Sequence, residues 1–329
     1  MLSTIYAALA RRRREWYSVR PHLRRRLRRP VISIGNIAAG GRGKTPFTAT
    51  VARMLLEAGE TPAILSRGYG RTDPADGSVV VRDREGIRAD LARSGDEPLM
   101  LARQLEGAIV VSAADRYISG RLAEHHLGAT VHLLDDGFQH FRIDRDLDIV
   151  LVSKADLESE TLPSGRLREP RDVLIAADAV VCVDEHAALE LPDIPVFLGR
   201  RANGAAVFEE TGGTPPSLGA PVVAVAGIAD PSAFFAALRE AGWQLTRTLT
   251  FRDHHPFTSA DMQGIVREVR DTNAEAILTT EKDFVRLLPH RPFPTAVGWV
   301  PHTMTAEPAE DFRRWLQVAL GAARDIVIG

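Results

Sequence analysis

Residues 30–45, PVISIGNIAAGGRGKT, decide the fold of this 329-residue chain. Val31, Ile32 and Ile34 are β-branched, which suits a buried parallel strand. The glycines that follow let the backbone curl so that its N–H groups point inward. The next segment, PFTATVARMLLEAG, is typical of a helix, and the amino end of a helix favours anionic ligands. The stretch therefore predicts a strand, a phosphate-binding loop and a helix.

This loop has the parts that bind a nucleoside triphosphate. Lys44 would reach the β- and γ-phosphates, and the Thr45 hydroxyl would bind Mg²⁺. Ala38 stands where the strict G-x-x-x-x-G-K-[ST] pattern has its first glycine, but the GGxGKT core is intact and in the required context. That context argues against a chance glycine turn before a helix. The predicted nucleotide-binding residues are Gly40, Gly41, Arg42, Gly43, Lys44 and Thr45.

The composition is that of a soluble globular protein, with 45% apolar and 26% charged residues. The length allows two domains or one large α/β unit. A single cysteine, Cys182, excludes an internal disulfide framework and is compatible with a reducing cytosol. No apolar run reaches the roughly 18 residues that predict a membrane-spanning helix.

The net charge of −2 hides a strongly basic start. Residues 1–30 contain ten arginines and one acid, so they carry +9 while the remaining chain carries −11. Apolar residues at Leu2, Ile5, Leu9 and Trp16 accompany this charge, which suits a helix lying on anionic lipid headgroups. Nucleic-acid binding and a solvated helix packed on its own domain are the alternatives. The localisation of the charge favours the membrane surface.

Strand and helix patterns alternate along the rest of the chain and predict two α/β units. We expect a basic amphipathic segment over residues 1–29 and a nucleotide-binding domain over 30–190. Proline and glycine are dense over 191–220, where VFLGR and AAVFEE predict two short strands that link the domains. A second, smaller α/β domain is expected over 221–329.

Paired acids, Asp135 and Asp136, end the apolar strand in ATVHLLDDG. An acid in this position after a phosphate loop is typical of a Walker B carboxylate, which holds Mg²⁺ directly or through water close to Thr45. The alternative is an ordinary strand-to-turn Asp-Asp-Gly. We expect Asp136 to be the nearer ligand and Asp135 to support it.

Two further segments carry residues suited to proton transfer. Asp96, in SGDEP, precedes the predicted helix LMLARQLEG, so it is an N-cap, a catalytic carboxylate or both. Asp253, His254 and His255 follow a strand of the second unit, and Lys282 has a similar place in TTEKD. No zinc-type ligand spacing accompanies the histidines, whereas Asp253 is placed to orient a catalytic histidine.

Residues 153–156, SKAD, approximate the element by which many GTPases read guanine. The D-x-x-G that such proteins carry earlier is missing. A membrane-associated P-loop switch, either a GTPase or a partition-type ATPase, is therefore the competing hypothesis. Ala39 argues against the partition type, which carries a signature lysine there. The next stretch, LPSGRLREP, is typical of a solvated loop.

GNIAAGGRGKTP, SRGYG, SGDEP, LLDDGFQH, LPSGRLREP, AGIADP, FRDHHPF and TTEKD occur together, in this order. In order and approximate spacing they resemble the tetraacyldisaccharide 4'-kinases, lipid A pathway enzymes of Gram-negative bacteria. The resemblance runs from the basic start to about residue 285. It implies an α/β fold: a P-loop NTPase-like α/β/α domain with a mostly parallel sheet, a smaller α/β domain and a short two-stranded link.

The resemblance also implies an activity. The chain would be an ATP-dependent lipid kinase that uses Mg²⁺ and transfers the γ-phosphate to the 4'-hydroxyl of a tetraacyldisaccharide 1-phosphate. It would act peripherally at the cytoplasmic face of the bacterial inner membrane, with no nucleic-acid partner and no obligate protein partner.

Roles carry over onto matching positions. Asp96 resembles the base that accepts the sugar hydroxyl proton, and His254 resembles the histidine that pairs with it. A dyad would let the proton move on to a group that titrates nearer neutrality. Because His254 lies in the second unit, catalysis would require the two domains to close. Lys44 would act in catalysis at the donor phosphates. Further matching positions that line the site are Glu97, Arg116, Gln139, His140, Arg168 and Glu169.

Overall fold

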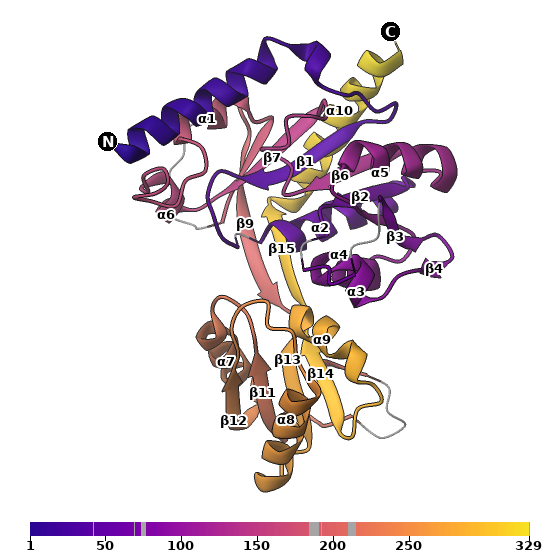
Figure 1. Cartoon of the computed structure of the whole chain (residues 1–329), viewed down its shortest axis with the longest axis vertical. Helices are drawn as coiled ribbons and strands as arrows, with labels where there is room; N and C mark the ends of the chain where they lie inside the picture. The colour runs from indigo at the N-terminus through magenta and orange to yellow at the C-terminus, as the bar shows by residue number, and fades with distance from the viewer. Residues whose placement is uncertain are drawn as a thin grey trace.

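The structure of the chain is a computed structural model, which describes residues 1–41, 43–68, 70–73, 77–183, 191, 193–209 and 215–328. Arg42, one of the predicted phosphate-binding residues, lies outside them. Two α/β units follow one another along the long axis of the molecule, the larger one carrying both chain ends (Figure 1).

The larger unit is built on strands β1 (Val31–Asn36), β2 (Pro62–Ser66), β3 (Val79–Asp83), β4 (Gly86–Ile87), β5 (Ile109–Ser112), β6 (Val131–Asp135), β7 (Leu147–Val152), β8 (Ala179–Cys182), β9 (Val196–Asn203) and β15 (His302–Glu307). Its helices are α1 (Leu2–Ser18), α2 (Lys44–Glu57), α3 (Leu91–Ser94), α4 (Asp96–Gln104), α5 (Arg116–Leu122), α6 (Lys154–Leu157) and α10 (Ala309–Ile328), with short helical turns η1 (Pro21–Leu23), η2 (Ala123–Leu127) and η3 (Arg171–Ala176). The sheet order is β15-β9-β8-β7-β1-β6-β2-β5-β3-β4.

The smaller unit contains strands β10 (Val207–Phe208), β11 (Pro221–Ala226), β12 (Gln244–Thr250), β13 (Ala276–Thr280) and β14 (Ala296–Val300). Its helices are α7 (Pro231–Glu240), α8 (Ser259–Asp271) and α9 (Glu281–Leu287), followed by the turn η4 (Leu288–His290). The sheet order is β10-β14-β13-β11-β12, and only β10 is antiparallel to its neighbour.

Strand β1 lies near the middle of the large sheet and pairs in parallel with β6 and β7. All six of its residues are buried, as the apolar run in the sequence predicts. Ile32 and Ile34 pack in one core with α2 and α4, and Val31 packs in another core on the opposite face. Because parallel strands end at the same edge, the loop after β1 and the acids at the end of β6 meet there.

The link between the two units differs in part from the prediction. VFLGR forms part of β9, but β10 belongs to the small sheet, and the second linking strand is β15. Strands β9 and β15 pair antiparallel and run side by side toward the small unit (Figure 1). Pro301 lies between β14 and β15. Because proline is disfavoured inside a strand, the sequence gives a weaker indication that the following segment forms a strand of its own.

Helix α10 also returns to the large unit, where Phe312, Leu316 and Leu320 join its core. The sequence placed residues 221–329 in the second domain. We propose instead that the second domain spans about residues 204–301, and that β15 and α10 complete the first.

Candidate active site

The phosphate loop is shaped by glycines. Gly43 is the N-cap of α2 and has a left-handed φ of 80°, and a Cβ atom there would approach the Met304 methyl to 2.5 Å. Gly40 also has a positive φ, of 105°. Lys44 Nζ donates to the Gly40 carbonyl at 3.3 Å, so this ammonium contacts the phosphate loop, where it is predicted to bind the β- and γ-phosphates.

The LPSGRLREP segment supports this loop from outside. The backbone N–H of Ala39 donates to the Arg166 carbonyl at 2.7 Å, and that of Arg168 donates to the Ile37 carbonyl at 2.7 Å. A segment that the sequence alone presents as a solvated loop is thus part of the site. Gly41 is exposed.

Asp135 ends β6 directly beside the start of α2. The Thr45 hydroxyl donates to Asp135 Oδ2 at 3.3 Å, and the Thr48 hydroxyl donates to Oδ1 at 3.2 Å. Burial, with the Glu97 and Asp136 carboxylates nearby, raises the pKa of Asp135 to about 6. A divalent cation would relieve this crowding of negative charge.

Magnesium fits this donor set. Thr45 and Asp135 offer hard oxygen ligands, which Mg²⁺ prefers, and Mg²⁺ takes its remaining ligands from substrate phosphates and water. Among the residues that the structure describes, no group of three or more His, Cys, Asp or Glu side chains could hold a metal ion alone. These residues would supply one part of a coordination shell that a nucleotide would complete.

Asp136 faces cations instead. Its Oδ1 lies 3.5 Å from Lys44 Nζ, and its Oδ2 accepts from Arg168 Nη1 at 3.2 Å. Burial would raise the pKa of Asp136, but Lys44 and Arg168 hold it below its ordinary value. The sequence favoured Asp136 as the nearer magnesium ligand, whereas the contacts place Asp135 next to Thr45.

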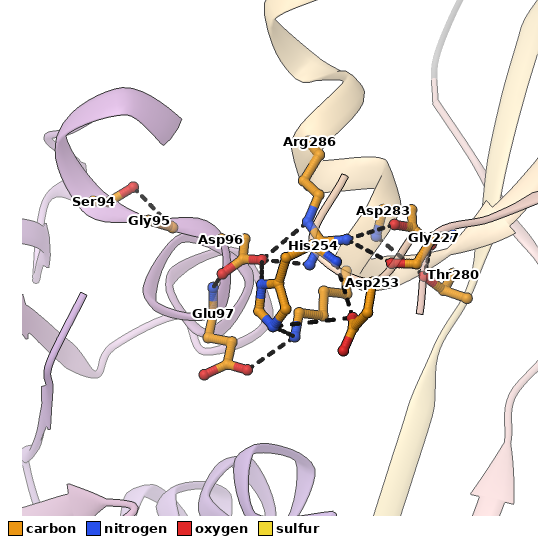
Figure 2. A network of polar contacts seen from close by, with 11 residues as sticks. Ser94, Gly95, Asp96, Glu97, Gly227, Asp253, His254, Thr280, Asp283 and Arg286 are labelled. Carbon is orange, nitrogen blue, oxygen red and sulfur yellow. Dashed lines mark hydrogen bonds and ion pairs between the residues drawn. The ribbon is translucent and has the colours of Figure 1, made fainter. Parts of the chain in front are cut away.

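Asp96 is the first residue of α4, and Gly95 rather than Asp96 is its N-cap. The Asp96 side chain is 6% exposed. Asp96 Oδ2 accepts from Arg286 Nε at 2.9 Å and contacts His254 Nδ1 at 2.9 Å, while Oδ1 accepts from the Glu97 backbone N–H at 2.9 Å (Figure 2). Burial alone would raise the pKa of Asp96, but Lys282, Arg286 and His254 together hold it below its ordinary value.

Only one of the two adjacent histidines enters this site. His254 follows β12 with a φ of 57°, and its backbone N–H donates to Asp253 Oδ1 at 2.9 Å. His255 points elsewhere and contacts Asp261 Oδ2 through Nε2 at 3.0 Å. The predicted contact between the units is already made, because His254 and Asp96 meet without further domain closure.

Arg116 and Gln139 lie on the donor side. Buried Arg116 donates from Nη2 to the Asp135 carbonyl at 3.0 Å. Gln139 Nε2 donates to the Asn36 carbonyl at 2.8 Å and to Glu169 Oε2 at 3.1 Å. Arg116 therefore contacts the end of β6, which carries the paired acids, and Gln139 contacts the end of β1, which the phosphate loop follows.

Glu169 is buried nearby, and His140 is half-buried. Arg14 of α1 donates two hydrogen bonds of 2.8 Å to the Glu169 carboxylate. The sequence did not predict this contact, because nothing distinguishes Arg14 from the other arginines of residues 1–30. Burial, with Arg116 and Arg145, lowers the pKa of His140 to about 4, so this ring is neutral at physiological pH.

The SKAD segment does not support the guanine hypothesis. Asp156 is fully buried, and its Oδ2 accepts from the Ser153 backbone N–H at 3.0 Å. Ser153 Oγ accepts in return from the Asp156 N–H, so the pair forms the capping box of α6. The carboxylate that would read a guanine base is used for this cap.

Of the two cations of α9 at this site, sequence reasoning noted Lys282 for its place in TTEKD and missed Arg286. Lys282 Nζ lies 3.0 Å from Glu97 Oε1 and 3.0 Å from His254 Nε2. Arg286 is buried against Asp96 and lies four residues after Lys282, hence on the same helix face. The four-residue spacing of these two cations, beginning in the TTEKD motif, was the sequence signal that could have placed Arg286 at the site.

Comparisons with known proteins identify the family to which the chain belongs. The model of the family described as tetraacyldisaccharide-1-P 4'-kinase (LpxK) matches residues 1–321. Proteins named tetraacyldisaccharide 4'-kinase from Koribacter versatilis and Pelobacter propionicus are both 41% identical to this chain. The first alignment covers 81% of this chain and 82% of the relative, and the second 87% and 81%.

Among solved structures, the crystal structure of LpxK from Aquifex aeolicus in complex with ATP is similar, with a TM-score of 0.81 and 29% sequence identity. The similarity covers 97% of each chain, so both α/β units are included. The whole-chain family match, the close relatives and the shared fold lead to one conclusion. The chain belongs to the tetraacyldisaccharide-1-P 4'-kinase family.

Proposed function

We propose that this kinase transfers the γ-phosphate of ATP to the 4'-hydroxyl of a tetraacyldisaccharide 1-phosphate, with Asp96 as base and His254 as its partner. Family membership supports the reaction. The observation that supports the two roles is the 2.9 Å contact between Asp96 Oδ2 and His254 Nδ1, which joins residues 158 positions apart.

On the donor side, the amides of the phosphate loop and Lys44 would hold the β- and γ-phosphates. Thr45 and Asp135 would hold Mg²⁺, which when bound neutralises charge on the phosphates. Asp136 would position Lys44, since its carboxylate lies 3.5 Å from the ammonium. These residues position the donor and neutralise charge, which is most of what phosphoryl transfer requires from a protein.

On the acceptor side, the 4'-oxygen bonds to the γ-phosphorus as the bond between that phosphorus and the β,γ-bridging oxygen breaks. ADP leaves and the hydroxyl proton passes to the Asp96 carboxylate. Asp96 is a weak base because its pKa is held low, chiefly by nearby cations that outweigh its burial. A weak base suffices where the transition state is loose, because the hydroxyl becomes acidic only as the new bond forms.

The direct test of the reaction follows a labelled γ-phosphate. Purified protein, Mg²⁺ and either ATP or GTP would be mixed with a lipid disaccharide 1-phosphate in detergent micelles. We expect label to appear in the lipid from ATP and only with Mg²⁺ present. An unlabelled lipid, together with nucleotide hydrolysis that the lipid does not change, would exclude the kinase and favour a P-loop switch.

We further propose that α1 rests on the cytoplasmic face of the bacterial inner membrane. Leu2, Ile5 and Leu9 are 68%, 53% and 62% exposed on a helix rich in arginine. Such a face suits anionic headgroups with shallow acyl contact. Among the described residues, no helix is long and apolar enough to span a bilayer.

The membrane proposal predicts the effect of two substitutions on one face of α1. Ile5→Ser with Leu9→Ser should weaken binding to anionic vesicles by about tenfold or more, because burying each side chain contributes roughly 1.5–3 kcal/mol. Vesicle co-sedimentation at two salt concentrations measures this, and wild-type binding should fall with salt. Val318→Ser, at an exposed apolar residue of α10, is the control and should bind normally. Unchanged binding by the α1 variant would give this helix a structural role only.

A further inference from the structure

Helix α9 of the smaller unit brings two cations to the proposed base: Arg286 contacts Asp96 directly, and Lys282 contacts its partner His254. Arg286 donates from Nε to Asp96 Oδ2, and it is anchored by Asp283 at 2.8 Å and by the Gly227 carbonyl at 2.9 Å. Its side chain is 4% exposed. Figure 2 shows Arg286 and His254 converging on Asp96 from the smaller unit.

Lys282 closes a ring of polar contacts. Asp96 Oδ2 contacts His254 Nδ1 at 2.9 Å, and His254 Nε2 lies 3.0 Å from Lys282 Nζ. Lys282 Nζ in turn donates to Glu97 Oε1 at 3.0 Å, and Glu97 follows Asp96 in α4. Four side chains from two α/β units therefore link into one circuit.

The chemistry of this ring defines the tautomer of His254. A lysine ammonium has three donors and no acceptor, and a carboxylate has only acceptors. Lys282 Nζ directs one donor at the Glu97 carboxylate, 3.0 Å away, and a second at His254 Nε2. Asp253 Oδ1 is 4.0 Å from His254 Nε2, beyond hydrogen-bond distance, so Lys282 at 3.0 Å is the closer polar group at this nitrogen. With an ammonium at Nε2 and a carboxylate at Nδ1, the contacts favour Nε2 as acceptor and a ring proton on Nδ1, donated to Asp96 Oδ2.

The two carboxylate oxygens of Asp96 are consequently different. Oδ2 contacts His254 Nδ1 and accepts from Nε and Nη2 of Arg286, whereas Oδ1 accepts from the Glu97 backbone N–H. Oδ2 is contacted by three donors and Oδ1 accepts from one, so Oδ1 is the oxygen better placed to accept from an incoming hydroxyl.

We propose that Lys282 is a positioning residue that holds His254 as the Nδ1–H tautomer, so that His254 donates to Asp96 Oδ2 and leaves Oδ1 to receive the 4'-hydroxyl proton. This inference rests on the proposed function, because it gives Lys282 a role only if Asp96 is the base. It also changes the role of His254. Its Nδ1 already carries a hydrogen, so His254 orients Asp96 and is not where the sugar proton goes.

The tautomer can be measured without catalysis. Two-bond ¹H–¹⁵N spectra of the full chain with ¹⁵N-labelled histidine report which ring nitrogen carries the proton, and His254→Gln identifies the signal. We expect a protonated Nδ1 and a bare Nε2 in the wild type, and a shift toward mixed tautomers in Lys282→Met. A protonated Nε2 in the wild type, or an unchanged tautomer in Lys282→Met, would overturn the proposal.

Kinetics supply the second readout. Lys282→Met keeps the aliphatic stem at a side chain that is 21% exposed, and we expect it to lower kcat by about 10- to 100-fold with an unchanged KM for ATP. Lys282→Arg should recover part of the loss, because guanidinium also donates. Lys154→Met, at an exposed lysine of α6, is the matched control and should keep normal turnover.

The outcomes separate this inference from the proposed function. If Lys282→Met keeps wild-type kcat while Asp96 and His254 variants lose turnover, Lys282 has no positioning role and the base assignment stands. If Asp96 variants keep turnover, the base assignment itself fails. A lowered thermal melting temperature in Lys282→Met, with no rescue by Lys282→Arg, would make Lys282 merely structural and also overturn the inference.

Discussion

Asp96→Asn should lower kcat by about 10²-fold or more, with little change in the KM for ATP. Asparagine keeps the shape of the side chain and can still accept from Arg286, but it cannot take the hydroxyl proton. The residues that we expect to bind the nucleotide and Mg²⁺ lie on the loop after β1 and at the end of β6, so donor binding should persist. Initial rates over a range of ATP concentrations, at saturating lipid, measure both constants.

A second aspartate–histidine pair provides the control for this result. Asp261 Oδ2 contacts His255 Nε2 at 3.0 Å, close to the site in sequence but outside it. Asp261→Asn should keep turnover near that of the wild type. Because Asp96 is buried in an ion network, circular dichroism melting of each variant must accompany the kinetics. A folded Asp96→Asn protein with near wild-type kcat would contradict the base assignment.

Asp135→Asn is the second substitution with a large expected effect, and it should separate activity from stability. Loss of a carboxylate that holds Mg²⁺ removes charge neutralisation at the phosphates, so we expect kcat to fall by about 10²- to 10³-fold. The pKa of Asp135 is raised to about 6, chiefly by burial and then by neighbouring carboxylates. At neutral pH its charge therefore destabilises the metal-free fold, so the amide should raise the melting temperature of that form.

The raised pKa of Asp135 also sets a pH dependence for magnesium. Metal binding needs the ionised carboxylate, and the folded, metal-free protein protonates it as the pH falls through about 6. The Mg²⁺ concentration for half-maximal activity should therefore rise below that pH, and less so in Asp135→Asn. Titrations of Mg²⁺ at several pH values test this, with melting curves of the metal-free proteins. An active Asp135→Asn variant, or one less stable than the metal-free wild type at pH 7, would exclude this role.

The sequence predicted those parts of the site that depend on local patterns. The phosphate loop after β1 and the acids after β6 are read from a strand followed by a turn, and each lies where the pattern places it. The meeting of Asp96 and His254 was expected only through the family resemblance, because no local pattern brings together residues so far apart.

What the sequence missed depends on tertiary structure. Arg14 reaches Glu169 across 155 residues, and nothing in a run of arginines marks the one that will do so. Arg286 reaches Asp96 across 190 residues in the same way. The return of β15 to the large sheet depends on pairing with β9, a contact between distant segments that composition does not reveal.

A double-mutant cycle on Asp96 and His254 tests the central claim most directly. Label transfer from ATP to the lipid would be compared for the wild type, Asp96→Ala, His254→Ala and the double variant. If the two residues act as one unit, each single substitution lowers kcat by about 10²-fold or more, and the double variant is scarcely slower than the worse single one. Losses that multiply, or a His254→Ala variant with near wild-type kcat, would show that the two residues do not act together.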